Sequence, residues 1–263
     1  MGRIRAAAKM TRGTAIVGQY WLACRIASLF PNSMSPSERM RLNCPRLTRA
    51  FGLNITIEGS PPSGPALLVS NHLSYMDIIV LSATAPVSFV AAEELGAWPF
   101  LGQVIKDAGT LFVNRSRRID IGRVVDKIEQ ALKEGRTIVI FPEGTTGPGA
   151  EVRRFHSGLL EPAARLNMPV HTATIRYKTT PPDMPAYRSV CWWEDISFPD
   201  HFRRMMKLRG RVDVHVVFGD QPIGPAPRKQ LALQLRQAVQ DNFEPLISEP
   251  PPGWEFDSKA RKP

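Results

Sequence analysis

Cysteine is scarce in this sequence of 263 residues, and its few copies form no recognisable framework. Cys24, Cys44 and Cys191 are odd in number and show no paired spacing. Paired or clustered cysteines are the sequence signs of disulfide-rich domains and of structural zinc sites. A chain of this length can bury a substantial core without such crosslinks. The sequence therefore favours a reducing compartment and predicts neither a disulfide framework nor a metal site.

An uninterrupted apolar run long enough to cross a membrane is also missing. Residues 14–30 are mostly apolar, but Gln19 and Arg25 interrupt them, whereas a spanning helix needs about 20 predominantly apolar residues. The preceding twelve residues carry four basic side chains and no acidic one. These features predict that segment 1–50 is a basic, amphipathic segment that associates with the membrane interface. A cleaved signal peptide and an ordinary core helix are the alternatives.

Acidic residues are fewer than basic ones, since 24 Asp and Glu face 34 Lys and Arg and leave a net charge of +10. Such an excess predicts an anionic partner, which could be nucleic acid, a membrane surface or an acidic small molecule. No DNA-binding motif is recognisable. The basic residues gather near the N-terminus, around residues 115–118 and 153–154, and along 203–211. This distribution favours a bilayer surface and acidic donor groups, and we expect no nucleic-acid partner.

Apolar runs of strand length alternate with helical patterns through the middle of the chain. This alternation is typical of the α/β class, and we expect a single domain over residues 51–247 with a mostly parallel central sheet flanked by helices. The proline-rich end, residues 248–263, is predicted to be a flexible tail. The expected strands are Asn54–Glu58, Ala66–Ser70, Ser88–Ala91, Gly109–Val113, Thr137–Phe141, Val170–Tyr177 and Val212–Phe218.

Two segments show strong helical periodicity. Within Ile119–Glu134, apolar residues recur at steps of three and four, and a glycine follows the last turn. A second pattern covers Arg228–Phe243, and shorter helices are expected after Asp77 and after His156.

The sequence has no Gly-x-Ser-x-Gly elbow, which is the usual setting of a hydrolase serine. It does place His72 directly after a predicted strand, with Asp77 five positions further on. A carboxylate that bonds one ring nitrogen fixes the histidine tautomer, and the other nitrogen can then accept a proton from a hydroxyl. Taken alone, such a pair in a loop is more often a structural hydrogen bond or a helix cap than a catalytic pair. If it is catalytic, it favours direct attack by a bound hydroxyl.

Two further strand ends carry residues suited to ligands. Glu143, Gly144 and Thr145 follow a strongly apolar strand, where the glycine permits close approach of a ligand and the threonine can cap or bind. Arg115 follows another strand and offers a guanidinium suited to phosphate or carboxylate. In isolation these residues could equally be a turn and a solvated charge.

Together these segments resemble the four sequence blocks of the glycerolipid acyltransferase family, which includes the 1-acylglycerol-3-phosphate acyltransferases. The similarity runs from about residue 51 to 176, with a looser match up to residue 220. The blocks appear in order as Asn71-His72-x-x-x-x-Asp77, Gly109-x-x-Phe112-x-x-Arg115, Phe141-Pro142-Glu143-Gly144-Thr145 and Met168-Pro169-Val170.

This resemblance implies transfer of a fatty acyl group from acyl-CoA or acyl carrier protein to the free hydroxyl of a lysolipid, such as 1-acylglycerol-3-phosphate, in membrane lipid synthesis. His72 would be the general base and Asp77 its orienting partner. No metal or bound cofactor is implied. The enzyme would work with membrane lipid on the cytoplasmic face of the inner membrane. The residues expected to bind the acceptor are Asn71, Gly109, Phe112, Arg115, Glu143, Gly144 and Thr145.

The chain departs from the family pattern at two positions. Thr146 stands where many phosphatidate-forming members carry a basic residue, and Ala92 stands where a lysine is frequent. A phosphate monoester recruits several charge-assisted hydrogen bonds, so both departures weaken the case for lysophosphatidate as the acceptor and admit lysophospholipids or a lyso-ornithine lipid as alternatives. A non-catalytic lipid-binding module and a hydrolase are the remaining alternatives.

Overall fold

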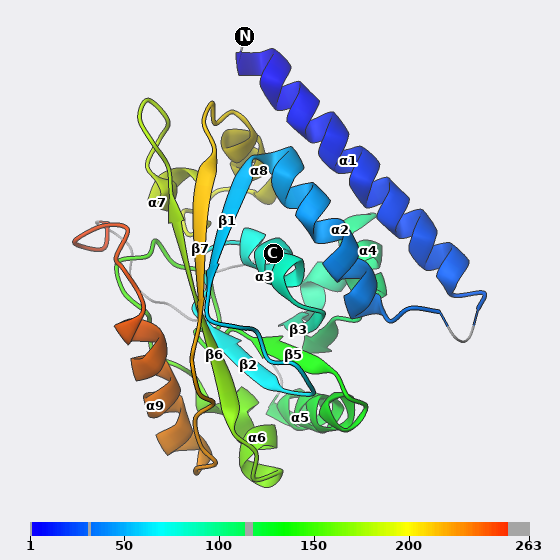
Figure 1. Ribbon diagram of the computed structural model, residues 1–263, viewed down its shortest axis with the longest axis vertical. Coiled ribbons are helices and arrows are strands. Elements are labelled where there is room, and N and C mark those ends of the chain that lie inside the picture. Colours follow the sequence, from blue (N-terminus) through cyan, green and yellow to red (C-terminus); the bar gives the residue numbers. More distant parts are fainter. Residues whose placement is uncertain (1, 31–32, 114–117, 252–263) are drawn as a thin grey trace.

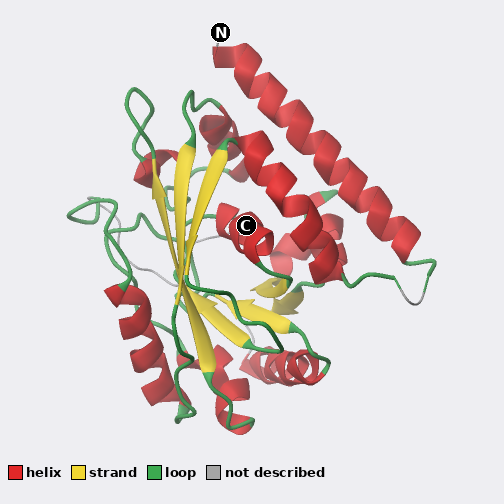
Figure 2. Ribbon diagram, viewed as in Figure 1, coloured by secondary structure: helices red, strands yellow, loops and turns green. Residues whose placement is uncertain are grey.

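The computed structural model describes residues 2–30, 33–113 and 118–251, and its centre is a twisted seven-stranded sheet (Figures 1 and 2). The strands lie in the order β1-β7-β6-β2-β5-β3-β4, and neighbours are parallel except for the antiparallel pair β6 and β7. The predicted α/β class and all seven predicted strands are confirmed. The strands are β1 (Leu53–Glu58), β2 (Leu67–Ser70), β3 (Val87–Ala92), β4 (Leu111–Val113), β5 (Thr137–Ile140), β6 (Val170–Lys178) and β7 (Val212–Phe218).

Helices flank the sheet, with α9 on one side and α2 and α3 on the other (Figure 1). The two periodic segments form α5 and α9, and short helical turns follow His156, as predicted. The described helices are α1 (Gly2–Ala27), α2 (Pro36–Phe51), α3 (Met76–Thr84), α4 (Leu101–Asp107), α5 (Arg118–Lys133), α6 (Glu161–Arg165), α7 (Ala186–Ser189), α8 (Phe198–Met206) and α9 (Arg228–Asp241), with 3-10 turns η1 (Glu93–Ala97) and η2 (Ser157–Leu160).

The middle strands β2 and β5 are buried along their whole length. Central strands of a parallel sheet are covered on both faces, so they read as continuous apolar runs. This is why Leu67, Leu68, Ile138 and Ile140 are among the large side chains that solvent does not reach. These buried strands place the loops that follow them at one edge of the sheet.

Helix α2 is an element that the sequence pattern did not predict. Pro45 lies inside it, and an interior proline removes a backbone donor and normally argues against a helix. The structure supports the helix at its start with a capping box between Ser35 and Glu38, and at its end with Gly52 in the left-handed region. Burial of Leu47 and Phe51 in the core adds tertiary packing that outweighs the proline.

Helix α1 lies alongside α2 and also contacts α4 and α8 (Figure 1). Its inner side buries Tyr20 and Cys24. The Tyr20 hydroxyl donates to the Asp107 carbonyl over 3.2 Å, and Arg25 forms an ion pair with the Asp107 carboxylate. The first helix is therefore docked on the body of the molecule by specific polar contacts.

Candidate active site

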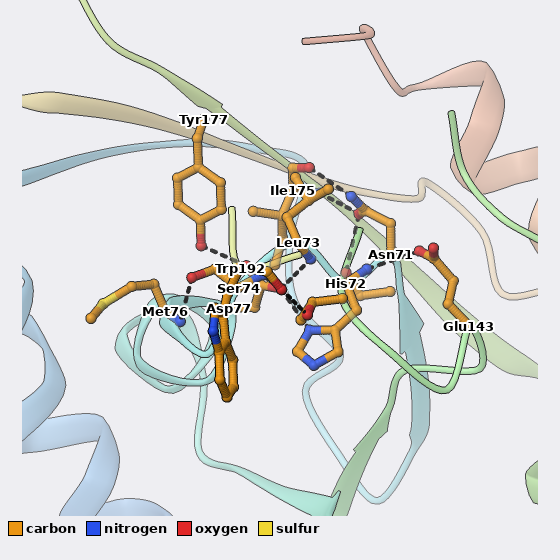
Figure 3. Close-up of polar contacts among 12 residues, drawn as sticks. Asn71, His72, Leu73, Ser74, Met76, Asp77, Glu143, Ile175, Tyr177 and Trp192 are labelled. Atoms are coloured by element: carbon orange, nitrogen blue, oxygen red, sulfur yellow. Dashed lines mark hydrogen bonds and ion pairs between the residues drawn. The ribbon is translucent and has the colours of Figure 1, made fainter. Parts of the chain in front are cut away.

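The site forms where the loops after β2 and β5 meet. The two strands are parallel neighbours, with Val69 beside Ile140, so their carboxyl ends reach the same edge of the sheet. Ligands of open α/β sheets bind at this edge. The first loop carries His72 and the second carries Glu143, and Figure 3 shows both side chains at this junction.

The predicted pair of His72 and Asp77 is in direct contact. Ring Nδ1 of His72 lies 2.8 Å from Asp77 Oδ2 (Figure 3). The Asp77 side chain is completely buried in the first turn of α3, whereas the His72 side chain is 19% exposed. One edge of the imidazole is thus fixed inside the protein, while the ring as a whole still reaches the surface.

Asp77 accepts hydrogen bonds on both carboxylate oxygens. Oδ2 receives the backbone N–H groups of Leu73 at 2.8 Å and Ser74 at 3.0 Å. Oδ1 receives the hydroxyl of Tyr177, on β6, at 2.6 Å. A buried carboxylate is costly unless donors surround it. These donors, together with the start of α3 and its helix dipole, hold the negative charge against the His72 ring.

Glu143 supports the backbone of the histidine loop. Its Oε1 accepts the His72 backbone N–H at 2.9 Å, and its Oε2 accepts the Arg153 backbone N–H at 3.3 Å. The side chain is 2% exposed. Burial raises the pKa of Glu143 to about 8, and the bond from His72 and the nearby Arg153 guanidinium partly oppose the rise. The sequence predicted an acceptor-binding role for this residue, whereas in the structure its carboxylate holds His72.

Asn71 is likewise engaged inside the protein. Its amide nitrogen donates to the Ile175 carbonyl at 2.8 Å, and its amide oxygen accepts the Ile175 backbone N–H at 2.8 Å. The side chain is 1% exposed. It therefore extends the pairing of β2 with β6 by one residue and fixes the point where the histidine loop leaves the sheet. This differs from the predicted contact with substrate.

Backbone contacts lock the same loop from the other side. The Gly147 N–H donates to the His72 carbonyl at 3.1 Å, and the Trp192 N–H donates to the Leu73 carbonyl at 2.8 Å. The Thr146 hydroxyl in turn donates to the Trp192 carbonyl. Thr146 stands where many phosphatidate-forming members of the family carry a basic residue. In this chain it is buried, and its hydroxyl is bonded to the backbone.

The face of the His72 ring rests on Phe141, with ring centroids 3.9 Å apart and planes 12° apart. Beyond it, Gly144 has φ +76°, and a Cβ there would come within 3.5 Å of the His156 ring. The left-handed backbone favours glycine at this turn. Thr145 follows and is partly exposed. Gly144 and Thr145 thus lie in the same loop as Glu143, which contacts His72, and their predicted contact with the acceptor stays a prediction.

The described residues of the second predicted block, Gly109 and Phe112, contact other parts of the fold. Gly109 lies near the amino end of β5, where its carbonyl accepts the Arg136 guanidinium at 2.6 Å. Phe112 packs beneath η1, since a Cβ on Gly96 would lie 3.2 Å from its ring. Arg115 falls outside the residues that the structure describes.

Sequence reasoning missed Tyr177 and Trp192 as parts of the site. Tyr177 was only the last residue of a predicted strand, and it lies 100 residues from its partner Asp77. Trp192 donates its backbone N–H to Leu73, and its ring packs edge-on against Tyr75 at a centroid distance of 5.6 Å, more than 100 residues away in the sequence. The topology supplies the missing signal, because β6 is the neighbour of β2 and its carboxyl end must lie beside the histidine loop.

Comparisons with known proteins agree with this picture. A family model described as Acyltransferase matches residues 53–176. The lyso-ornithine lipid O-acyltransferase of Pseudomonas aeruginosa is 35% identical over 201 residues, covering 74% of each chain. The 1-acyl-sn-glycerol-3-phosphate acyltransferase of Neisseria meningitidis serogroup B is 34% identical over 175 residues, covering 62% of this chain and 65% of the other.

A solved structure shares the fold. The 1-acyl-sn-glycerophosphate acyltransferase from Thermotoga maritima matches with a TM-score of 0.65, over 92% of this chain and 98% of its own, at 20% identity.

Proposed function

The chain belongs to the acyltransferase family of lysolipid and 1-acylglycerol-3-phosphate acyltransferases of phospholipid biosynthesis, and from this premise we propose that His72 is its general base. The observation that carries the proposal is the 2.8 Å contact between His72 Nδ1 and a completely buried Asp77. This contact leaves Nε2 as the ring nitrogen that can take a proton.

The proposed reaction has two steps. The free hydroxyl of the lysolipid attacks the thioester carbonyl carbon while its proton passes to His72 Nε2, which forms a tetrahedral oxyanion. Collapse of this intermediate breaks the carbon–sulfur bond, and the imidazolium returns the proton to the departing thiolate. Asp77 stabilises the imidazolium and keeps the ring in orientation. The stacked Phe141 supports the ring face.

We propose acyl-CoA or acyl carrier protein as the acyl donor, with no metal and no bound cofactor. Either thioester supplies the acyl group and a thiolate leaving group, so proton transfer is the only chemistry required of the protein. Gly144 and Thr145 are the described residues beside His72 that we assign to acceptor contact, together with Arg115 from the second block.

For the acceptor we propose 1-acylglycerol-3-phosphate, which would give phosphatidic acid. Lyso-ornithine lipid is the second candidate. It is favoured by the neutral Thr146, whose hydroxyl binds the Trp192 carbonyl and so adds no charge for a phosphate. The similarity to the Pseudomonas aeruginosa protein points the same way.

We further propose that the enzyme works on the cytoplasmic face of the inner membrane, with helix α1 in contact with lipid. No helix within the described ranges is long and apolar enough to span a bilayer. In the last turns of α1 and directly after it, however, four large apolar side chains are more than half exposed, and we refer to them as the α1 stripe: Leu22, Ile26, Leu29 and Phe30. Large apolar side chains that are exposed together on a protein surface can mark a site of contact with a membrane.

The proposal is tested with purified protein, labelled acyl-CoA or acyl carrier protein, and a panel of lysolipids. We expect transfer to a lysolipid hydroxyl and its loss in His72→Ala, with lysolipid binding retained. His215→Ala is the matched control, because His215 lies on β7 beside Glu58 and Arg176. Transfer that persists in His72→Ala would refute the mechanism.

The same assay separates the alternatives. Label released as free fatty acid would indicate a hydrolase, and lysolipid binding without any transfer would indicate a binding module. Incorporation into lyso-ornithine lipid and not into lysophosphatidate would select the second acceptor.

A further inference from the structure

Tyr177 lies at the end of β6, with its hydroxyl inside the protein against the aspartate of the proposed catalytic pair (Figure 3). The residue is 3% exposed, and its hydroxyl donates to Asp77 Oδ1 over 2.6 Å. Burial, together with the negative charge of Asp77, raises the pKa of Tyr177 well above its usual range. The hydroxyl therefore keeps its proton and acts as a donor.

The contacts of Asp77 divide between its two oxygens. Oδ2 accepts two backbone N–H groups and faces His72 Nδ1, while Oδ1 receives the tyrosine hydroxyl. A backbone N–H can only donate, and a tyrosine that keeps its proton donates as well. Surrounded by these donors, the carboxylate is stabilised in its ionised form. An ionised carboxylate can only accept, so His72 Nδ1 must carry the proton.

We propose that Tyr177 is a positioning residue for the acyl transfer reaction. By holding Oδ1, it keeps Asp77 ionised and aimed at the histidine, and through Asp77 it fixes the tautomer in which Nε2 of His72 is free to accept a proton. The inference rests on the proposed role of His72 as general base. Tyr177 lies outside all four sequence blocks that identified the site, so the inference adds a residue of β6 to it.

Removal of the hydroxyl leaves a buried carboxylate oxygen with one donor fewer. The carboxylate is then held less firmly against His72 and stabilises the imidazolium less. Tyr177→Phe keeps the ring and its packing, so the change isolates this effect. We expect kcat at neutral pH to fall roughly tenfold, as for loss of one hydrogen bond to a charged group, with KM within about twofold of its original value.

The matched control is Thr174→Val on the same strand. Thr174 is also buried, and its hydroxyl donates to the Val239 carbonyl at 3.1 Å, on the opposite face of β6. Both substitutions remove one buried hydroxyl from β6, and only one of them touches Asp77. Urea unfolding of both variants shows how far each change weakens the strand.

Two measurements decide the role of Tyr177. The pH profile of kcat should change in Tyr177→Phe and stay in place in Thr174→Val. In ¹⁵N NMR of the histidine ring, the wild type should show a protonated Nδ1 and an unprotonated Nε2 above the acidic limb, and Tyr177→Phe should show a mixture of tautomers.

An unchanged pH profile together with an unchanged tautomer in Tyr177→Phe would overturn the inference and reduce the contact to a structural hydrogen bond. The NMR comparison needs no turnover. If the wild type transferred no acyl group to any lysolipid, the proposed function would fail, whereas the tautomer would still decide whether Tyr177 acts on His72 through Asp77.

Discussion

The loops around His72 and the end of helix α1 differ in which side chains they bury and which they expose. Around His72 the structure buries charged and polar groups, including Asp77 and Glu143, and surrounds them with donors. At the end of α1 it leaves the apolar side chains of the α1 stripe exposed to solvent, although the same helix buries Tyr20 and Cys24 on its inner side.

Both arrangements cost stability in water, and each cost indicates a use. Burial of a carboxylate is unfavourable unless hydrogen bonds stabilise it, and here the buried carboxylates hold His72 in one position. Exposed large apolar side chains that cluster on a surface mark a contact with another apolar phase. The first region is complete in the folded chain, whereas the second would be completed by lipid. The predictions below test this contrast.

Asp77→Asn should have the largest effect. The substitution removes the negative charge that stabilises the His72 imidazolium and places an amide donor among the donors that now face Asp77. We expect kcat for acyl transfer to fall on the order of 10³-fold, within the range of general acid–base catalysis. Steady-state kinetics with a lysolipid acceptor measure the change.

Asp213→Asn is the control for this loss. Asp213 is an exposed carboxylate on β7 that accepts the side-chain amide of Asn54, on β1, at 2.9 Å. Its kcat should match the wild type. An Asp77→Asn enzyme with near-normal kcat would show that the buried pair is structural, and the contrast between the two regions would lose its catalytic half.

The reach of sequence reasoning in this site depends on sequence separation. His72 and Asp77 are five positions apart, and Glu143 lies just past an obvious strand, so short motifs identified all three. The contact of Asn71 with Ile175 and that of Asp77 with Tyr177 could not be read in the same way, because Ile175 and Tyr177 lie on β6, about 100 residues from the histidine loop. The residue types predicted a catalytic His–Asp pair, and only the order of the strands explains how its side chains are held in place.

Asn71→Ala should have the next largest effect, which is a loss of folding stability. It leaves the Ile175 N–H and carbonyl buried without the partners that the amide now supplies. Each unsatisfied buried group costs about 1–3 kcal/mol, so we expect the free energy of unfolding to fall by roughly 4 kcal/mol. Asn54→Ala, which removes an exposed amide contact, should cost less than about 0.5 kcal/mol. Equal losses in urea unfolding would contradict the assigned role of Asn71.

The fold itself was largely readable because buried parallel strands leave continuous apolar runs. The seven predicted strands were all found, whereas α2 was missed because Pro45 hides a helix that caps and packing sustain. The antiparallel placement of β7 was also beyond the pattern. A strand such as Val212–Phe218 has the same composition whether it runs parallel or antiparallel to its neighbour. Only the path of the chain in three dimensions determines its direction.

Glu143→Gln should change how stability depends on pH. Burial raises the pKa of Glu143 from 4.5 to about 8, so between these values the folded state binds a proton that the unfolded state has released. The free energy of unfolding should therefore fall as pH rises from about 5 to 8, by ~3 kcal/mol from this group, and level off above. Glu143→Gln should flatten this slope. Glu244→Gln, an exposed partner of Arg176, should leave the slope unchanged, and the same slope in both variants would count against the buried carboxyl.

The smallest expected effect concerns the α1 stripe. Leu22 and Ile26 are 54% and 51% exposed and lie one turn apart on the same face of the helix. Replacing both with serine removes apolar surface that we assign to lipid contact. We expect binding to vesicles that contain anionic phospholipid to weaken about tenfold, which corresponds to roughly 1.4 kcal/mol, while the unfolding midpoint stays the same.

Leu233→Ser provides the comparison for the stripe. Leu233 is 71% exposed on α9, on the side of the molecule away from α1 (Figure 1). If exposure alone governed vesicle binding, this variant would weaken it as much as the α1 change does. If α1 contacts lipid, vesicle flotation should show a loss only for the Leu22 and Ile26 variant, and transfer to detergent-dispersed lysolipid should remain at the wild-type rate. Loss of transfer in detergent would instead place these side chains in the reaction itself, because no bilayer is present there to bind.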